Sequence, residues 1–261
     1  MWSEWPEDAT HDRLIGPWYF YQRKGGHRTS TDDVLAAWLA SKICEAQPPE
    51  TYIDIGCGIG SVLLMTAHRL RPRHSHGVEA QAQSATMALR SVRELPEDAP
   101  PISIHHGDLR DPSLVLPKAD LITGSPPYFP LGAGVLSPDP QRVACRFETR
   151  GGVEAYCEAA ARLLKPEGDF CIVFIAKEIP RMEGAARAAG LHERVRSVWK
   201  TRSDNDEAFL SVHAYCLQTA AAASTPTEYW EGSVRDAEGR HTPEYRDLRV
   251  FMGWETETPP R

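Results

Sequence analysis

The chain has 261 residues, of which 41% are hydrophobic and 25% charged, and its net charge is −7 at pH 7. This composition is typical of a globular protein with a sizeable core, and no apolar run is long enough to cross a bilayer. The net acidity excludes a protein that coats nucleic acid without preference, because such binding needs clustered Lys and Arg. Six scattered cysteines predict reduced thiols and no metal, and the N-terminus lacks a signal-peptide pattern, so we expect a cytoplasmic protein.

Helical and strand patterns alternate from about residue 31 to residue 217. We expect helices over residues 31–45, 61–70, 81–93, 153–164 and 179–189. We expect strands over residues 52–55, 77–79, 102–105, 120–123, 170–175, 194–199 and 209–217. The alternation predicts a mostly parallel sheet with helices on both faces, in which the last two strands pair as a hairpin.

Three other stretches lack a clear pattern. Residues 124–150 are rich in Pro and Gly, which indicates a long loop that is functional or mobile. Residues 220–226 are predicted to be a spacer, and residues 227–261 a polar tail with weak structure signals. Residues 23–28 carry four basic side chains, and on charge alone a solvated turn is the simpler interpretation.

A glycine-rich turn joins the first predicted strand to the following helix. Gly56, Gly58 and Gly60 follow the strand that contains Asp54. Such glycines permit a tight turn and a close approach of backbone to a ligand. A phosphate loop would need a Lys after the glycines, and a dinucleotide fingerprint would need Gly or Ala in place of Ser61. The pattern therefore favours a nucleoside-containing ligand that has no pyrophosphate.

Acidic residues end the next two predicted strands. Glu79 follows the glycines by about twenty residues, which is the position that contacts ribose hydroxyls in dinucleotide folds. Asp108, followed by Leu109, ends the third strand. Its carboxylate is suited to accept a hydrogen bond from an adenine amine, although a turn-forming aspartate explains it equally well.

The fourth predicted strand ends in Ser125-Pro126-Pro127-Tyr128-Phe129. The two prolines fix the backbone and remove two donors, which leaves the Pro126 carbonyl free as an acceptor. The Ser125 hydroxyl supplies a second acceptor, and Tyr128 can stack on a base. Two acceptors aimed at an amine orient its lone pair towards an electrophile.

Together these motifs resemble the bacterial tRNA(Val) adenine-N6 methyltransferase family. Residues 22–35 resemble that family's N-terminal motif, in which a Thr-Asp pair opens a helix, and residues 144–148 resemble the stretch after its catalytic loop. The resemblance covers residues 14–217. It implies a Rossmann-like, seven-stranded α/β fold of class I, S-adenosylmethionine as cofactor, and a tRNA substrate.

The resemblance also implies roles for individual residues. Gln22, Arg28, Thr31 and Asp32 would border the cofactor pocket. The expected cofactor-binding set is Arg28, Thr31, Asp32, Asp54, Gly56, Gly58, Gly60, Glu79, Asp108, Leu109 and Ser125. The expected catalytic set is Ser125, Pro126, Pro127 and Tyr128. The expected substrate-binding set is Arg23, Lys24, Arg28, Tyr128 and Phe129, with Lys200 and Arg202 as further phosphate contacts.

The family usually has Asn where this chain has Ser125. Ser-Pro-Pro-Tyr also resembles the signature of cytosine-N4 methyltransferases, so the reaction type is predicted while the base stays open. A protein glutamine N-methyltransferase and a non-catalytic RNA-binding protein of the same fold are also compatible with the sequence. We expect one methyltransferase domain over residues 1–261, with an N-terminal motif (1–50), a catalytic core (51–217) and an extension (218–261). No oligomeric state is predicted.

Overall fold

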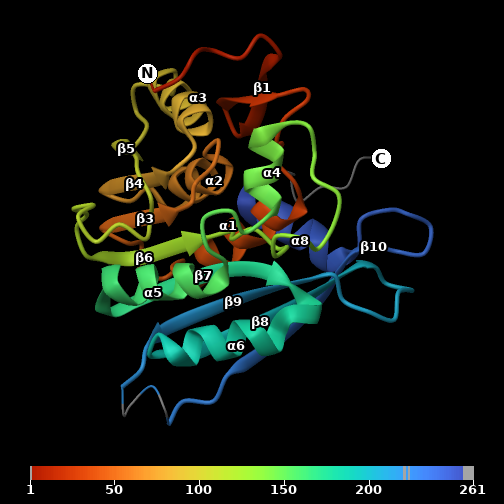
Figure 1. The fold of residues 1–261 in the computed structure, drawn as a ribbon. Helices are drawn as coiled ribbons and strands as arrows, with labels where there is room; N and C mark the ends of the chain where they lie inside the picture. The colour runs from red at the N-terminus through yellow and green to blue at the C-terminus, as the bar shows by residue number, and fades with distance from the viewer. Residues whose placement is uncertain (1, 220–221, 223, 255–261) are drawn as a thin grey trace.

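The computed structural model describes residues 2–219, 222 and 224–254, and its centre is one twisted sheet (Figure 1). The order of its strands is β10-β8-β9-β7-β6-β3-β4-β5. The strands are β3 (Thr51–Ile55), β4 (His74–Glu79), β5 (Ile102–His106), β6 (Ala119–Gly124), β7 (Leu164–Ile175), β8 (Leu191–Arg202), β9 (Leu210–Leu217) and β10 (Glu228–Arg235).

Strand direction confirms the predicted topology. β3, β4, β5, β6 and β7 run parallel to their neighbours within this group. β9 is antiparallel to both β7 and β8, as the predicted C-terminal hairpin requires. The strand order reverses between β3 and β6, and ligands bind at the carboxyl ends of strands beside such a reversal.

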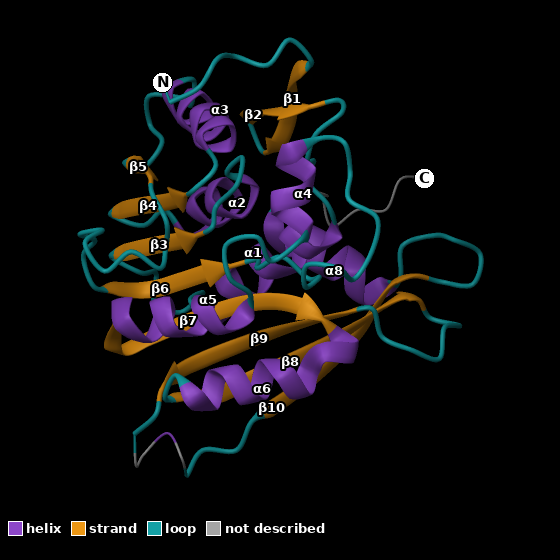
Figure 2. Ribbon diagram, in the orientation of Figure 1, coloured by secondary structure: helices purple, strands orange, loops and turns teal. Residues whose placement is uncertain are grey.

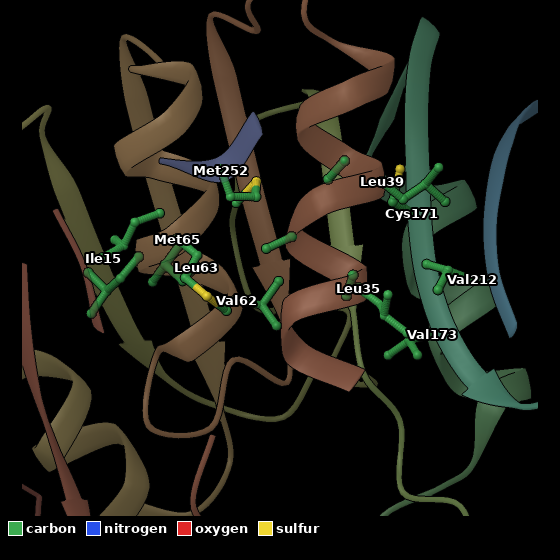
Figure 3. Close-up of a cluster of buried hydrophobic side chains, with 14 of the residues drawn as sticks. Ile15, Leu35, Leu39, Val62, Leu63, Met65, Cys171, Val173, Val212 and Met252 are labelled. Carbon is green, nitrogen blue, oxygen red and sulfur yellow. The ribbon is translucent and has the colours of Figure 1, made fainter. Parts of the chain in front are cut away.

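Helices cover both faces of the sheet (Figure 2). They are α1 (Thr31–Ile43), α2 (Ser61–Leu70), α3 (Ala82–Arg93), α4 (Pro140–Arg146), α5 (Val153–Leu163), α6 (Ile179–Ala188) and α8 (Pro243–Met252), with a 3-10 turn, η1 (Ala176–Glu178). The five predicted helices correspond to α1, α2, α3, α5 and α6. Successive residues of β7 point to opposite faces: Cys171 and Val173 join the core under α1 and α2, whereas Phe170 and Ile172 join the core under α5 and α6. Figure 3 shows the first of these cores.

The predicted loop over residues 124–150 contains α4. Asp139 caps this helix by accepting a hydrogen bond from the Arg142 amide, and Pro140 occupies its first turn. Seven residues are too few to show a helical period, so the sequence pattern did not reveal α4. Its place is beyond the carboxyl ends of β3, β4 and β6 (Figure 2).

The N-terminal region forms a hairpin that the sequence pattern did not predict. β1 (Ala9–Ile15) and β2 (Trp18–Arg23) are antiparallel. Trp18 and Phe20 alternate with more exposed residues along β2 and are buried in the core beside α1 and α2. The hairpin thereby anchors the segment that leads into α1.

Part of the tail, for which the sequence carries only weak structure signals, forms a strand and a helix. β10 joins the seven expected strands as an eighth, parallel to β8, and α8 packs against β10. β10 is an edge strand with mostly polar residues, so the sequence pattern did not reveal it. Gly232 leaves room for Trp199, because a Cβ atom there would lie 2.7 Å from the indole ring. Residues 220, 221 and 223 of the predicted spacer, and residues 255–261 of the tail, lie outside the described residues.

The described helices include none that is long and apolar enough to span a membrane.

Candidate active site

One pocket lies at the carboxyl ends of β3, β4, β5 and β6, under α4. Most residues of the predicted cofactor and catalytic sets lie on its wall: Asp32, Asp54, Gly56, Gly58, Glu79, Asp108, Leu109, Ser125, Pro126, Pro127 and Tyr128. Nine predicted site residues are not part of this wall: Gln22, Arg23, Lys24, Arg28, Thr31, Gly60, Phe129, Lys200 and Arg202.

The glycine turn brings backbone to the floor of the pocket. Gly56, Gly58 and Gly60 all have positive φ angles, of 71°, 56° and 91°, which L side chains rarely adopt. A Cβ on Gly58 would meet no atom within 4 Å, so Gly58 faces open space. A Cβ on Gly56 would lie 2.9 Å from Cζ of Tyr156 and closer still to its hydroxyl. Gly60 is the N-cap of α2 and supports the turn from outside the pocket.

Glu79 is fixed at the end of β4 by two backbone amides. Its Oε2 accepts a hydrogen bond from the Gly58 amide at 2.9 Å, and its Oε1 accepts one from the Gln81 amide at 2.6 Å. Burial raises the pKa of Glu79, and these two hydrogen bonds oppose that shift. The carboxylate is therefore oriented before any ligand binds, in the position expected for a contact with ribose hydroxyls.

Asp54 lies deeper, at the end of β3. Its Oδ1 accepts a hydrogen bond from the Thr123 hydroxyl at 2.7 Å, and that hydroxyl is 2.6 Å from the hydroxyl of Tyr52. Its Oδ2 has no hydrogen-bond partner among the described residues, although it is buried. Burial raises the pKa of Asp54 to about 7. A buried carboxylate oxygen without a donor on a pocket wall is suited to receive a cationic group of a ligand.

Asp108 is engaged by a neighbouring arginine. Both of its oxygens accept hydrogen bonds from the Arg110 guanidinium, at 2.9 and 2.7 Å, and the Arg110 amide donates another. These contacts lower the pKa of Asp108. The carboxylate is thus charged and held at the pocket wall beside Leu109, with lone pairs left for one further donor.

The Ser-Pro-Pro-Tyr segment is joined to the start of α1 by a single hydrogen bond. The Tyr128 hydroxyl donates to Oδ2 of Asp32 at 2.7 Å, and its ring packs edge-on against Phe174 with centroids 5.7 Å apart. The other oxygen of Asp32 accepts from the Ser30 hydroxyl. Burial raises the pKa of Tyr128 well above its ordinary value, and the Asp32 carboxylate adds to this shift. The N-terminal motif therefore positions the tyrosine of the catalytic loop.

Phe129 closes the loop that contains α4. Its amide donates to the Arg146 carbonyl at 3.0 Å, and its carbonyl accepts from the Glu148 amide at 2.9 Å. Its ring contacts Phe147 and the Arg146 guanidinium. Arg181 of α6 then holds Glu148 through an ion pair of 2.7 Å. Phe129 thus acts on the shape of the loop and lies outside the pocket.

The basic segment near residue 23 is largely occupied by internal ion pairs. Arg23 contacts Asp8 and Asp139, both at 2.7 Å, and only 17% of its side chain is exposed. Arg28 contacts Asp12 at 3.2 Å. Lys24 is exposed. Of the three basic residues expected to bind substrate in this segment, the structure therefore leaves only Lys24 without a carboxylate partner among the described residues. Of the two further expected phosphate contacts, Arg202 pairs with Asp204 at 3.0 Å, and Lys200 lies beside it on β8.

Several pocket residues were missed by sequence reasoning. They are His27, Asp33, Ser61, Gln81, Cys145, Arg150 and Tyr156. Asp33 was detectable, because it completes a capping box with Ser30 at the start of α1. Tyr156 and Arg150 follow a long irregular stretch, and no local pattern assigns them to the pocket.

These features fit S-adenosylmethionine. A nucleoside needs a carboxylate for its ribose and a close approach of backbone, which Glu79 and Gly58 offer. The amino acid part of the molecule carries an ammonium group, which a pocket wall with the carboxyl groups of Asp32, Asp54 and Glu79 favours electrostatically. No cluster of side chains in the described ranges is arranged to hold a metal ion.

Comparisons with known proteins place the chain among methyltransferases. Residues 35–108, which run from α1 through the glycine turn to Asp108, match the family model "Histone methylation protein DOT1". The chain is 30% identical over 229 residues to a tRNA1(Val) (adenine(37)-N6)-methyltransferase of Yersinia pestis, with 85% of each protein covered. It is 28% identical over 224 residues to the enzyme of that name from Musicola paradisiaca, again with 85% of each covered.

Solved structures show the same fold at low sequence identity. A predicted O-methyltransferase from Agrobacterium tumefaciens has a TM-score of 0.61 at 17% identity, covering 84% of this chain and 97% of that one. TYW2 of M. jannaschii, solved in complex with AdoMet, has a TM-score of 0.55 at 15% identity, covering 83% and 90%. With the glycine turn, Glu79 and the Ser-Pro-Pro-Tyr segment on one pocket, the chain belongs to the tRNA1(Val) (adenine(37)-N6)-methyltransferase family and is an S-adenosylmethionine-dependent methyltransferase.

Proposed function

We propose that this protein methylates the N6 amine of an adenine in tRNA. The observation that carries the proposal is that Ser125, Pro126 and Tyr128 line the same pocket as Gly58 and Glu79. This arrangement supports an amine acceptor site next to the cofactor site. The names of the relatives support adenine and tRNA as the substrate.

The chain's own residues then have distinct tasks. The cofactor supplies an electrophilic methyl group. Ser125 and the Pro126 carbonyl accept hydrogen bonds from the substrate amine, which turns its lone pair towards that methyl group and stabilises the positive charge that develops on nitrogen. Tyr128 offers a ring face to the flipped base, and its hydroxyl bond to Asp32 keeps the ring from rotating. The new N–C bond would form as the bond between the methyl carbon and sulfur breaks, and the nitrogen would then release one proton to solvent.

Cofactor binding is assigned to the residues at the ends of β3, β4 and β5. Glu79 is proposed to accept from the ribose hydroxyls, Asp108 from the adenine amine, and Asp54 from the ammonium group. The fixed orientation of Glu79 by two amides supports its role. Thr31, Arg28 and Gly60 lie off the pocket wall, so we assign them to the support of α1, of the N-terminal hairpin and of the glycine turn.

Methyl transfer from labelled S-adenosylmethionine to an unmodified tRNA transcript tests the function. We expect label in the RNA with the wild-type protein and a large loss of kcat with Ser125→Ala and with Tyr128→Ala, while cofactor affinity stays within about twofold. Ser125→Asn should retain activity, because the longer amide supplies the same acceptor. Unlabelled RNA with the wild-type protein would contradict the proposal.

Cytosine N4 is the second candidate, and Ser125 is the observation that favours it. A serine hydroxyl reaches less far than an asparagine amide, so the amine must lie closer to the loop. Transfer to cytidine in place of adenosine would establish cytosine as the substrate base.

We further propose that residues 1–261 work as one methyltransferase domain. The pairing of β10 with β8 and the packing of β2 on α3 support this, since β2 and β10, which flank the expected catalytic core in sequence, pack on the same structure.

A further inference from the structure

A set of arginines without carboxylate partners borders the proposed active site. Arg142 and Arg146 are one helical turn apart on α4, and Arg150 follows in the next loop; all three are exposed. Within the described part of the chain, none of the three forms an ion pair. Most other arginines around the pocket are neutralised, as Arg23 and Arg110 illustrate.

The inner face of α4 explains why these arginines point outward. Gln141 is 3% exposed, and its side chain binds the Ser84 hydroxyl at 2.9 Å and the His27 amide at 3.3 Å. Cys145, one turn later, contacts the side-chain nitrogen of Gln81 at 3.5 Å. These contacts fix α4 against α3 and the segment before α1, so Arg142 and Arg146 are held at the rim.

A second pocket lies beside the first and shares Ala144 and Arg150 with it. Its wall is largely apolar and includes Leu136 and Val143. Leu136 is 51% exposed, so the apolar wall is open to solvent. The second pocket therefore offers an apolar surface on which a base can stack, and Arg150, which it shares with the first pocket, offers a positive charge for a phosphate.

We propose that this second pocket and the three arginines bind the RNA nucleotides that flank the methylated one. The inference rests on the proposed function and names the surface that holds the RNA. A flanking base would pack on the apolar wall, while Arg142, Arg146 and Arg150 contact the phosphates on either side. In the basic segment at residues 23–28, Arg23 and Arg28 are held by internal ion pairs, which leaves Lys24 as its one lysine or arginine without such a pair among the described residues.

Salt dependence of binding to an unmodified tRNA transcript tests the surface. A plot of log affinity against log salt concentration has a negative slope, to which each phosphate contact contributes roughly 0.7–0.9. The triple variant Arg142→Gln/Arg146→Gln/Arg150→Gln should make this slope shallower by about two. KM for the transcript should rise about tenfold. The double variant Arg142→Gln/Arg146→Gln, which keeps Arg150 on the wall of the first pocket, should raise KM less and leave cofactor affinity unchanged. The corresponding triple lysine variant should retain the wild-type slope, because the charge is kept.

The apolar pocket is tested separately. Leu136→Glu should raise KM for the transcript severalfold, whereas Val115→Glu should leave it unchanged. Val115 is 89% exposed and lies in the connection that leads to the amino end of β6, whereas the pocket lies at the carboxyl ends of the strands. Both variants add one negative charge at an exposed position, so folding is preserved in each.

Two comparisons show whether a negative result concerns the proposed RNA-binding surface or the proposed methyltransferase function. Arg187→Gln removes one exposed positive charge near the C-terminal end of α6, the end away from Arg181 and its contact with Glu148, and should change neither slope nor KM. If the wild-type protein labels tRNA but the triple glutamine variant keeps the wild-type slope and KM, the proposed RNA-binding surface is wrong, whereas the proposed tRNA methylation is unaffected. If the wild-type protein labels no RNA, both are overturned.

Discussion

Alanine substitutions at two neighbouring glycines of the turn should have very different effects on stability. Both Gly56 and Gly58 have positive φ, so alanine at either position costs about 1–2 kcal/mol of backbone strain. At Gly58 the new methyl group meets no atom within 4 Å, and no further cost arises in the free protein. At Gly56 it would lie 2.9 Å from Cζ of Tyr156, which adds about 1–3 kcal/mol of overpacking.

We therefore expect Gly58→Ala to lower the free energy of unfolding by about 1–2 kcal/mol and Gly56→Ala by roughly 2–5 kcal/mol. Urea denaturation without cofactor measures both. Adding Tyr156→Phe to Gly56→Ala removes the closest atom, the hydroxyl, and should restore part of the loss, on the order of 1 kcal/mol. The ring carbons stay, so recovery is incomplete.

Gly58→Ala, the variant with the smaller expected loss of stability, should show the clear loss of cofactor affinity. The methyl group of Gly58→Ala enters the open space of the pocket, so calorimetric titration with S-adenosylmethionine should show a loss of about tenfold or more although the protein stays folded. Equal destabilisation by the two substitutions, or unchanged affinity in Gly58→Ala, would refute this account of the turn.

Three further substitutions test other contacts. Asp32→Ala and Tyr128→Phe should each lower kcat by about 10- to 100-fold, because each removes the same charge-assisted hydrogen bond. The double variant should therefore have a kcat no lower than that of either single variant. Additive losses of kcat in steady-state kinetics would contradict this coupling. Burial raises the pKa of Asp54 to about 7 in the folded protein, so folding takes up a proton between about pH 4 and pH 7 and stability falls as pH rises through that window. The free energy of unfolding of Asp54→Asn should therefore be higher than that of the wild type by roughly 1–3 kcal/mol at pH 8. This difference should shrink towards pH 5. A difference that does not change with pH would show that the raised pKa of Asp54 is not its cause. Gly232→Ala should destabilise by about 1–3 kcal/mol through its clash with Trp199, measured by thermal unfolding, without changing kcat at temperatures where the protein is folded.

The sheet was predictable because its central strands are buried runs between strong turn signals. β3 and β6 are apolar and are followed by the glycine turn and by two prolines, so their carboxyl ends and the residues placed there were clear from the sequence. Edge elements gave weaker signals. β10 is mostly polar, since an edge strand faces solvent, and its pairing with β8 depends on contacts distant in sequence.

The basic segment shows a limit of charge patterns. Arg23 and Lys24 are adjacent in sequence, yet Arg23 is held by Asp8 and Asp139 while Lys24 is exposed. Asp139 belongs to the cap of α4, more than a hundred residues away, so no local pattern reveals this pairing. The pocket residues that follow α4, such as Arg150 and Tyr156, were missed for the same reason.

Nucleoside analysis of the labelled product tests the central claim most directly. The wild-type protein is incubated with an unmodified tRNA transcript and S-adenosylmethionine, and the RNA is digested and separated by mass spectrometry. We predict N6-methyladenosine, absent with Tyr128→Ala. N4-methylcytidine as the product, or a protein that binds the cofactor and labels no RNA, would contradict the claim that this pocket methylates adenine in tRNA.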